Sequence, residues 1–579
     1  MNLITLEFAT NLFVQRATNH ASKVSAYHAI CVLEGLGKIS DLNAASEEDD
    51  NPLQLERVAF SYNSVKFHMQ KVSDIKDLQH KDQEVQIIGK HLEEKLQRVF
   101  LKSLLSSDEG NLNKVLRIYS LISEEKKAEN CFRQEIVQPF MKDLVTQNNV
   151  TKLGLDKVYT RILGFISSSC QEILNMTQRC RRRSDIITGF DFLVNAVWPE
   201  FIECLGYVSS VHLYSVGDPQ LFHQNYSASM KFLDSFETFC GDQNSVRRLR
   251  SLASYKEFNS KWNLDVYFQI RFQEIAGEFE KSLLEAFVNL KDENSAYNLN
   301  ATQSLCLSLD RCWGEGIFLL PLKHHFWRLT LQLLSRYKHW ALTTIELGDT
   351  DAKQMALLIK DVQILLPHLK ILFEASIQPK IRRSEAVDGQ VLATFNDTLV
   401  KLEEIPKHAG KCIVKLLMEK CTSHLKWISS IPQRFRKTNR ELPSKPSPYV
   451  SQVLSPLTEF SQDVKSVLSP GWVENCEQEI IDGVMSQCMT QMSDVLTSIK
   501  KMEDSLKILK RARDKPSGQS AMGAISDDDK IRRQLAIDVN CFEELIVKSG
   551  LQGNKVKSLK ELKALVLSAE KAAGVIGNS

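Results

Sequence analysis

The sequence predicts an all-α protein, built as an elongated rod of stacked antiparallel helical bundles with a helical bundle domain at its C-terminal end. Two observations lead to this prediction. Along most of the chain, apolar residues recur at steps of three and four, which places them on one face of a helix. Glycine and proline, which sheets and long loops need for their turns, number only 24 and 15 among 579 residues. Long helices joined by short connections satisfy both observations.

Composition and charge narrow the class of protein. The net charge of +2 predicts no strong general attraction to nucleic acid or acidic membranes. The 13 cysteines are scattered without a Cys-x-x-Cys pair, which is typical of reduced packing thiols in the cytosol. No apolar run approaches the ~20 residues needed to cross a bilayer. Met1–Arg16 contains Glu7 and has no basic leader, so we expect no signal peptide there.

Asn263–Phe287 is predicted to form one long helix with a buried face, because seven of its apolar residues follow steps of three and four. They are Leu264, Phe268, Phe272, Ile275, Phe279, Leu283 and Phe287. Asn263 is a plausible N-cap, and Asp265 suits the positive end of the helix dipole. An apolar stripe of this kind normally faces a partner element, so we expect it to form core rather than a ligand site.

The length allows about four domains at ~150 residues each, and breaks in the pattern suggest where the chain divides. We expect, in order, a short N-terminal helical remnant with an acidic linker (1–51), a helical bundle (52–183), an aromatic-rich helical bundle (184–345), a helical bundle (350–435), a Pro-rich linker (436–449) and a C-terminal helical domain (450–579).

Within the first bundle, three apolar stripes predict amphipathic helices of hairpin length. They are Leu55, Val58, Tyr62, Val65, Met69 and Val72; Ile88, Leu92, Leu96 and Val99; and Leu112, Val115, Leu116, Tyr119 and Ile122. Ser106–Asn111 is expected to break the helix before the third stripe. Pro139 should kink or restart a helix, because proline lacks the N–H that the helix ladder needs.

The C-terminal domain contains a strict heptad seam with alternating steps of four and three. Its members are Cys488, Met492, Val495, Ile499, Met502, Leu506 and Leu509. Such a seam fits a coiled coil or a bundle edge, and it is our candidate partner-binding surface. Downstream, Ser526 is expected to cap a helix that begins with Asp527-Asp528-Asp529 and buries Ile531, Leu535, Val539, Phe542 and Ile546.

The densest basic patch consists of Arg179, Arg181, Arg182 and Arg183. A phosphate or lipid headgroup could bind such a patch. No aromatic residue interleaves with it and Asp185 follows closely, so a solvated loop is the favoured interpretation and headgroup contact the alternative.

No pattern for catalysis, metal or cofactor binding emerges. The chain has no Gly-rich phosphate loop, no His-Glu-x-x-His and no Gly-x-Ser-x-Gly elbow. The adjacent pair His324-His325 points in directions some 100° apart on a helix and has no carboxylate or cysteine at i+4. We therefore expect no catalytic, cofactor-binding or metal-binding residues, and a scaffold rather than an enzyme.

Several longer motifs together resemble one family of vesicle-tethering subunits. They are Phe190–Pro199, Phe258–Leu264, Phe326–Gln332, Arg436–Pro443 and Ser526–Ile531, with Ala128-Glu129 and Val137-Gln138-Pro139 upstream. The set is similar to the second-subunit family of the conserved oligomeric Golgi complex, over about residue 20 to the C-terminus. In that family a long N-terminal coiled coil precedes the matching body. Most of it is expected to be missing here, as in a shortened product or a chain with a misplaced start.

The resemblance implies a non-catalytic subunit of a Golgi vesicle-tethering complex that acts in intra-Golgi retrograde transport, Golgi organisation and the retention of glycosylation enzymes. Implied partners are the first, third and fourth subunits and, through the complex, SNAREs, Rab GTPases and golgins. The implied location is peripheral, on the cytoplasmic face of Golgi membranes, with a cytosolic pool. The alternatives are a membrane-surface-binding module, using Arg179–Arg183 and Arg247–Arg250, or a tether of the exocyst type.

Overall fold

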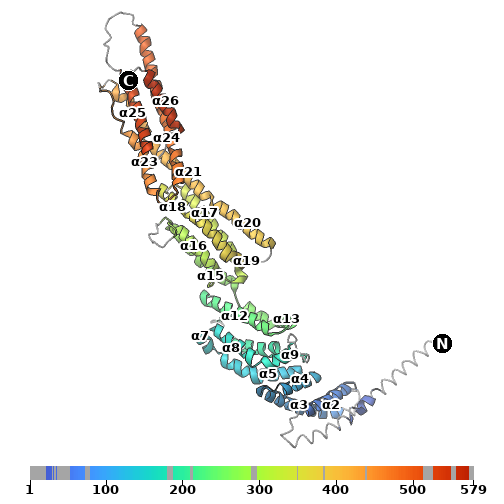
Figure 1. Cartoon of the computed structure of the whole chain (residues 1–579). Coiled ribbons are helices and arrows are strands. Elements are labelled where there is room, and N and C mark those ends of the chain that lie inside the picture. Colours follow the sequence, from blue (N-terminus) through green and yellow to red (C-terminus); the bar gives the residue numbers. More distant parts are fainter. Residues whose placement is uncertain are drawn as a thin grey trace, which may run out of the picture. The chain divides into compact units, whose positions relative to one another are not determined.

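The computed structural model describes residues 52–71, 79–178, 187–208, 213–287, 296–348, 350–382, 385–436, 438, 440–512, 526–549 and 556–572, with short runs between 21 and 34. These residues are helical almost throughout and include no β-strand, which confirms the all-α prediction (Figure 1). The chain forms two compact units, Met1–Tyr267 and Phe268–Ser579. The finer division into separate bundles and their predicted stacking into an elongated rod remain predictions. The predicted acidic linker lies outside the described residues.

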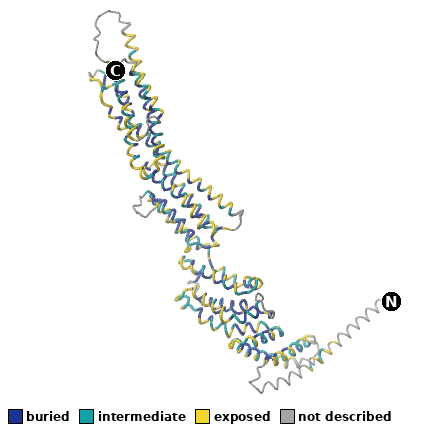
Figure 2. Tube along the Cα trace, viewed as in Figure 1, coloured by how far each residue is buried: buried dark blue, intermediate teal, exposed yellow. Residues whose placement is uncertain are grey.

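The first unit begins with three helices that pack against one another: α2 (Pro52–Lys71), α3 (Gln79–Leu105) and α4 (Glu109–Leu121). The predicted stripe of α4 is buried along its whole length. Figure 2 shows buried, intermediate and exposed residues interspersed along the helices of the chain. The predicted break is shorter than expected, because Asp108 caps α4 by accepting the N–H of Asn111 at 3.1 Å. An N-cap carboxylate can therefore restart a helix inside a stretch whose composition favours a loop.

Further helices complete the first unit around an aromatic core. They are α5 (Glu125–Phe132), α6 (Gln138–Leu144), α7 (Gln147–Leu153), α8 (Leu155–Ser168), α9 (Gln171–Thr177), α10 (Trp198–Gly206), α12 (Pro219–Phe239), α13 (Gln243–Ser251) and α14 (Ala253–Ser260). The centre of this core is Trp198, which is fully buried. Its ring lies 5.6 Å from that of Phe201 and 5.7 Å from that of Phe236, so α10 and α12 are held together by ring contacts.

Three π-helical turns each precede an X-Pro pair: η2 (Arg133–Val137), η3 (Leu193–Val197) and η5 (Phe373–Ile377). In the first, the N–H of Gln138 bonds to the carbonyl of Arg133, five residues back. Because proline has no N–H and its ring clashes with the preceding turn, a widened turn accommodates it without ending the helix. At Pro139, where a kink or a restart was predicted, the helix changes from a π-turn to an α-helix without a break, and Pro199 and Pro379 follow the same rule.

The second unit starts within α15 (Leu264–Leu284), whose sequence stripe was only partly right. Asn263 caps the helix as predicted, accepting the N–H of Val266 at 3.1 Å. Ile275, Phe279 and Leu283 are buried and Phe287 is half-buried, but Phe272 is 37% exposed. The buried line instead reaches Arg271, which is 8% exposed and pairs with Glu274 at 2.9 Å. The correction has a simple reason: a buried face that continues in steps of four from Ile275 towards the N-terminus reaches Arg271, which the apolar stripe did not include.

The remaining helices of the second unit fall into a central group and a C-terminal group. The central group comprises α16 (Asn300–Trp313), η4 (Leu320–Leu322), α17 (Lys323–Glu346), α18 (Ala352–Leu372), α19 (Gln378–Ile381), α20 (Glu385–Leu402), α21 (Glu404–Thr422), η6 (Leu425–Ser430) and α22 (Ile431–Phe435). The C-terminal group comprises α23 (Tyr449–Val464), α24 (Pro470–Ala512), α25 (Asp527–Lys548) and α26 (Lys557–Ala572). Both groups pack through α21, which contacts α18 as well as α24.

Two sequence predictions about the C-terminal group can be checked directly. Ser526 caps α25 by accepting the N–H of Asp528 at 3.1 Å, and the predicted α25 stripe is buried, so both predictions are confirmed. The Pro-rich stretch between α22 and α23 is also tied to α25. The N–H of Ser447 donates to Asp538 Oδ1 at 2.7 Å, and Gln534 Nε2 donates to the carbonyl of Lys445 at 3.0 Å.

Candidate functional site

The heptad seam divides into an inner half and an outer half with different surroundings. The inner half, Cys488, Met492, Val495 and Ile499, is at most 7% exposed. The outer half, Met502, Leu506 and Leu509, is 45%, 51% and 61% exposed. Both halves lie on the single helix α24, so the division is one of packing and not of secondary structure.

Helices of the same unit cover the inner half of the seam. Helix α24 packs against α26, α21 and α25, and Asp482 accepts the N–H of Ser558 at 2.9 Å where α26 begins. Burial, with a smaller effect from the charge of Asp538, raises the pKa of the Cys488 thiol to about 12. A buried thiol of this kind is an unreactive packing group, and the inner half is not accessible to a partner.

The outer half begins where those packing helices end. Arg532 of α25 pairs with Glu503 at 2.6 Å, and the neighbouring Arg533 pairs with Glu570 near the end of α26, also at 2.6 Å. Through these two ion pairs, α25 is tied to α24 at Glu503 and to α26 at Glu570. Beyond Glu503, the apolar residues of the seam continue without a covering helix among the described residues.

Charged residues flank the outer half. Ile508, which is 66% exposed, widens the apolar stripe, and Lys500 and Lys501 are exposed beside it. Lys507 pairs with Asp504 at 3.8 Å. A narrow apolar stripe with heptad spacing and flanking charges is suited to a second helix lying along α24.

The predicted basic patch, Arg179, Arg181, Arg182 and Arg183, lies outside the described residues. The second arginine group, at Arg247–Arg250, is described. Arg248 pairs with Asp191 and Arg250 with Glu237, both at 2.6 Å. Because two of its three arginines are already neutralised within the unit, this group offers little free charge to an anionic surface.

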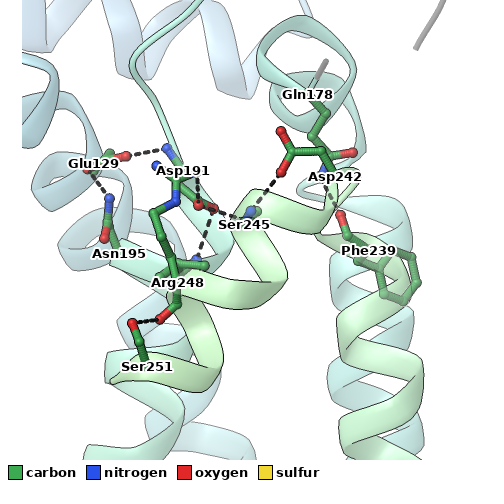
Figure 3. Close-up of polar contacts among 10 residues, drawn as sticks. Glu129, Gln178, Asp191, Asn195, Phe239, Asp242, Ser245, Arg248 and Ser251 are labelled. Carbon is green, nitrogen blue, oxygen red and sulfur yellow. Dashed lines mark hydrogen bonds and ion pairs between the residues drawn. The ribbon is translucent and has the colours of Figure 1, made fainter. Parts of the chain in front are cut away.

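A polar cluster in the first unit joins three segments that are distant in sequence (Figure 3). Glu129 of α5 accepts the N–H of Asp191 at 2.6 Å and Nδ2 of Asn195 at 2.9 Å. Asp191 in turn accepts from Ser245 Oγ at 2.7 Å and from Arg248 at 2.6 Å. The cluster therefore braces α5, the η3 turn and α13 together.

Burial dominates the electrostatics of this cluster. It raises the pKa of both Glu129 and Asp191, although the hydrogen bonds and Arg248 act in the opposite direction. Each carboxylate accepts hydrogen bonds from the donors around it, including the Ser245 hydroxyl on Asp191, and these bonds hold it in place. The arrangement is that of a structural brace rather than of an acid–base pair.

This brace was not predicted in the sequence analysis, although two of its residues belong to motifs named there. Glu129 and Asp191 both occur in motifs that carry the family resemblance, but nothing in their local pattern shows that they meet across 62 residues. A buried carboxylate beside a π-turn could be inferred only once the packing was known.

The described residues contain no group of three or more His, Cys, Asp or Glu side chains placed to hold a metal ion. Within the same residues, no helix is both long enough and apolar enough to span a membrane.

The fold and these surfaces define an all-helical scaffold whose notable features are internal braces and an uncovered helix face. A family model described as "COG complex component, COG2, C-terminal" matches residues 260–539. Among curated relatives, the human conserved oligomeric Golgi complex subunit 2 is 32% identical over 95% of this chain and 82% of its own length. The proteins of the same name from Drosophila melanogaster and Arabidopsis thaliana are 30% and 27% identical, over 91% and 90% of this chain and 77% and 73% of their own lengths. The chain belongs to the COG2 family, which confirms the resemblance found in the sequence.

Proposed function

We propose that this chain is a non-catalytic subunit of a Golgi vesicle-tethering complex, acting in intra-Golgi retrograde vesicle transport, Golgi organisation and the maintenance of glycosylation enzymes. The observation that carries the proposal is its family membership, with similarity that extends over 95% of the chain to a relative named as a Golgi complex subunit. The protein would be held peripherally on the cytoplasmic face of Golgi membranes by its partners.

The proposed partners are the first, third and fourth subunits, with SNAREs, Rab GTPases and golgins reached through the complex. The outer half of the seam is the proposed contact with one of these subunits. Its support is the exposure of Met502, Leu506 and Leu509, because contiguous exposed apolar residues with regular spacing typically mark protein interaction sites. The inner half of the seam is buried within the unit and is not part of the proposed contact.

A capture experiment with purified third and fourth subunits tests this function. The bait is the full chain, compared with a variant that carries Met502→Asp, Leu506→Asp and Leu509→Asp. A matched control carries Ile371→Asp, Leu392→Asp and Val400→Asp, three other exposed apolar positions of the same unit. We expect capture by the wild type and the control, and a loss of about tenfold or more in the seam variant.

The possible results separate the two levels of the proposal. If the wild type captures neither subunit, the proposed function fails. If all three baits capture equally, the chain has the proposed function but the outer half is not the contact. A control that loses capture as strongly as the seam variant would point to a general effect of added charge.

A further inference from the structure

A groove runs between α23 and the first turns of α24, and the end of α25 closes one side. Its volume is about 600 Å³. Three helices line it with the following residues: Ser451, Leu454, Ser455, Leu457, Thr458, Ser461, Gln462 and Lys465; Pro470, Val473, Glu474, Glu477 and Ile481; and Leu545, Ile546, Lys548 and Ser549. Several of these residues, including Ser451, Thr458 and Glu474, are exposed, so the groove is open to solvent. It precedes the heptad seam on α24.

The lining residues follow helical periodicity on both walls. On α23 they recur from Ser451 to Lys465 at steps of three and four, and on α24 from Pro470 to Ile481 in the same way. Each helix therefore presents one complete face to the groove. The α23 wall is about 21 Å long at 1.5 Å per residue. Two helix faces that converge without a third helix between them form a natural seat for a helix.

The floor and the α23 wall suit an amphipathic occupant. Leu454, Leu457, Ile481 and Ile546 are each at most 5% exposed and supply an apolar floor. Ser451, Ser455, Thr458 and Ser461 line the α23 wall with small hydroxyl side chains. Small side chains let a neighbouring helix approach closely, and the hydroxyls can satisfy polar groups at its edge.

A buried carboxylate at the groove specifies the chemistry of the occupant. Glu477 is 8% exposed, and its Oε1 accepts a hydrogen bond from Ser461 Oγ. Among the described residues, no cation pairs with it. Buried carboxylates are normally paired with a cation, because an isolated buried charge is costly. A Lys or Arg side chain that enters from the groove would supply such a cation to Glu477.

We propose that this groove binds an amphipathic helix of a partner protein, with a Lys or Arg of that helix reaching Glu477 among its apolar side chains. The rim adds a second element of complementarity. Lys465 and Lys548 line the mouth and are exposed, and no carboxylate pairs with them among the described residues. Acidic residues on the outer edges of the docked helix match them.

A display library of helix-forming 18-residue peptides is a direct probe. The peptides carry apolar residues at helical spacing and random residues between them, and the full chain is the target. We expect enriched peptides to place one Lys or Arg within the apolar face. Binding is expected to be lost in the groove-filling variant Ser455→Trp. It should persist in Gln452→Trp, which adds the same side chain at an exposed α23 position outside the groove.

The variant Glu477→Gln keeps the groove shape and tests the charge, and it also covers the case in which Ser455→Trp fails to fold. It is expected to weaken binding of the Lys- or Arg-containing peptides by about tenfold and to leave their Gln-substituted forms unchanged. Three results would overturn the proposal. The enriched peptides could show no preference for Lys or Arg, the wild type could enrich no more peptide than Ser455→Trp does, or phosphatidylserine-containing vesicles could compete with the peptides for binding. So would a homodimer of the chain that Ser455→Trp dissociates, since the occupant would then be a second copy.

Discussion

The inner and outer halves of the heptad seam share one helix and one spacing, yet only the inner half is buried. Met492 is completely buried and Met502, ten residues later, is 45% exposed. The difference arises because the helices of the same unit cover the inner half of the seam and leave the side chains of the outer half largely exposed. Heptad periodicity thus predicts that a helix has an apolar face. The length of the neighbouring helices decides how much of that face is buried within the same chain.

The matched pair Met492→Ala and Met502→Ala should show the largest difference between the halves. We expect Met492→Ala to lower the free energy of unfolding of the second unit by about 2–5 kcal/mol, because it opens a cavity in a packed core. Met502→Ala should change it by less than about 0.5 kcal/mol, as for an exposed substitution. Denaturant titrations followed by circular dichroism measure both. Equal losses would mean that the outer half is also packed.

Thiol labelling should distinguish the halves by rate. Cys488 is buried with a pKa raised to about 12, so it reacts only when the bundle opens. A cysteine introduced by Leu506→Cys should react about 100-fold faster or more at mildly alkaline pH. Peptide mapping by mass spectrometry separates the two sites from the other cysteines. Similar rates would show that the inner half opens readily and is itself accessible.

The inner half should also respond to pH through Asp538. Burial raises the pKa of this carboxyl, and Ser447, Gln534 and Tyr449 act in the opposite direction. The folded chain therefore holds the proton more tightly than the unfolded chain does. The resulting stabilisation is present below the ordinary Asp pKa and is lost as pH rises through the raised value.

Relative to an Asp538→Asn variant, the wild type should consequently lose stability over the pH range above the ordinary Asp pKa of 3.8. Unfolding free energies measured across this range test the slope, with Asp504→Asn in the exposed part of α24 as the control substitution. A wild type that gains stability relative to Asp538→Asn over the same range would contradict this prediction.

The smallest expected effect concerns the border between the halves. Glu503→Gln removes the charge that pairs with Arg532, while Asp529 still pairs with that arginine at 3.1 Å. Because the pair is partly exposed, we expect a cost of about 0.5–1 kcal/mol. Amide exchange should accelerate over residues 503–509 but not over 488–499. Faster exchange in both segments would show that the border does not separate them.

Much of the fold could be predicted from sequence because it depends on local signals. Helical spacing identified the buried α4 and α25 stripes, and side-chain capping identified Asn263 and Ser526. The exception on α15 is instructive. There the buried line passes through Arg271. The spacing of apolar residues could not predict this, because it shows neither the ion-pair partner Glu274 nor the direction of the neighbouring helices.

The candidate surfaces depend on contacts between distant segments, which the sequence does not display. The same seven-residue pattern gave no indication that Ile499 is buried and Leu506 exposed. Likewise, no local pattern indicates that Glu477 lies beside Ser461 of α23 at the groove. Local pattern could not show which neighbour covers each face, and that coverage decides which faces remain for partners.

Amide hydrogen exchange over residues 500–509, in the isolated chain and in complex with the third and fourth Golgi-complex subunits, tests the central claim most directly. The exposed outer half should be covered by a partner helix, so we predict slower exchange in the complex, with little change over the already protected residues 488–499. Unchanged exchange at 500–509 in a complex that has demonstrably formed would contradict the claim that this end of α24 is the partner-binding surface.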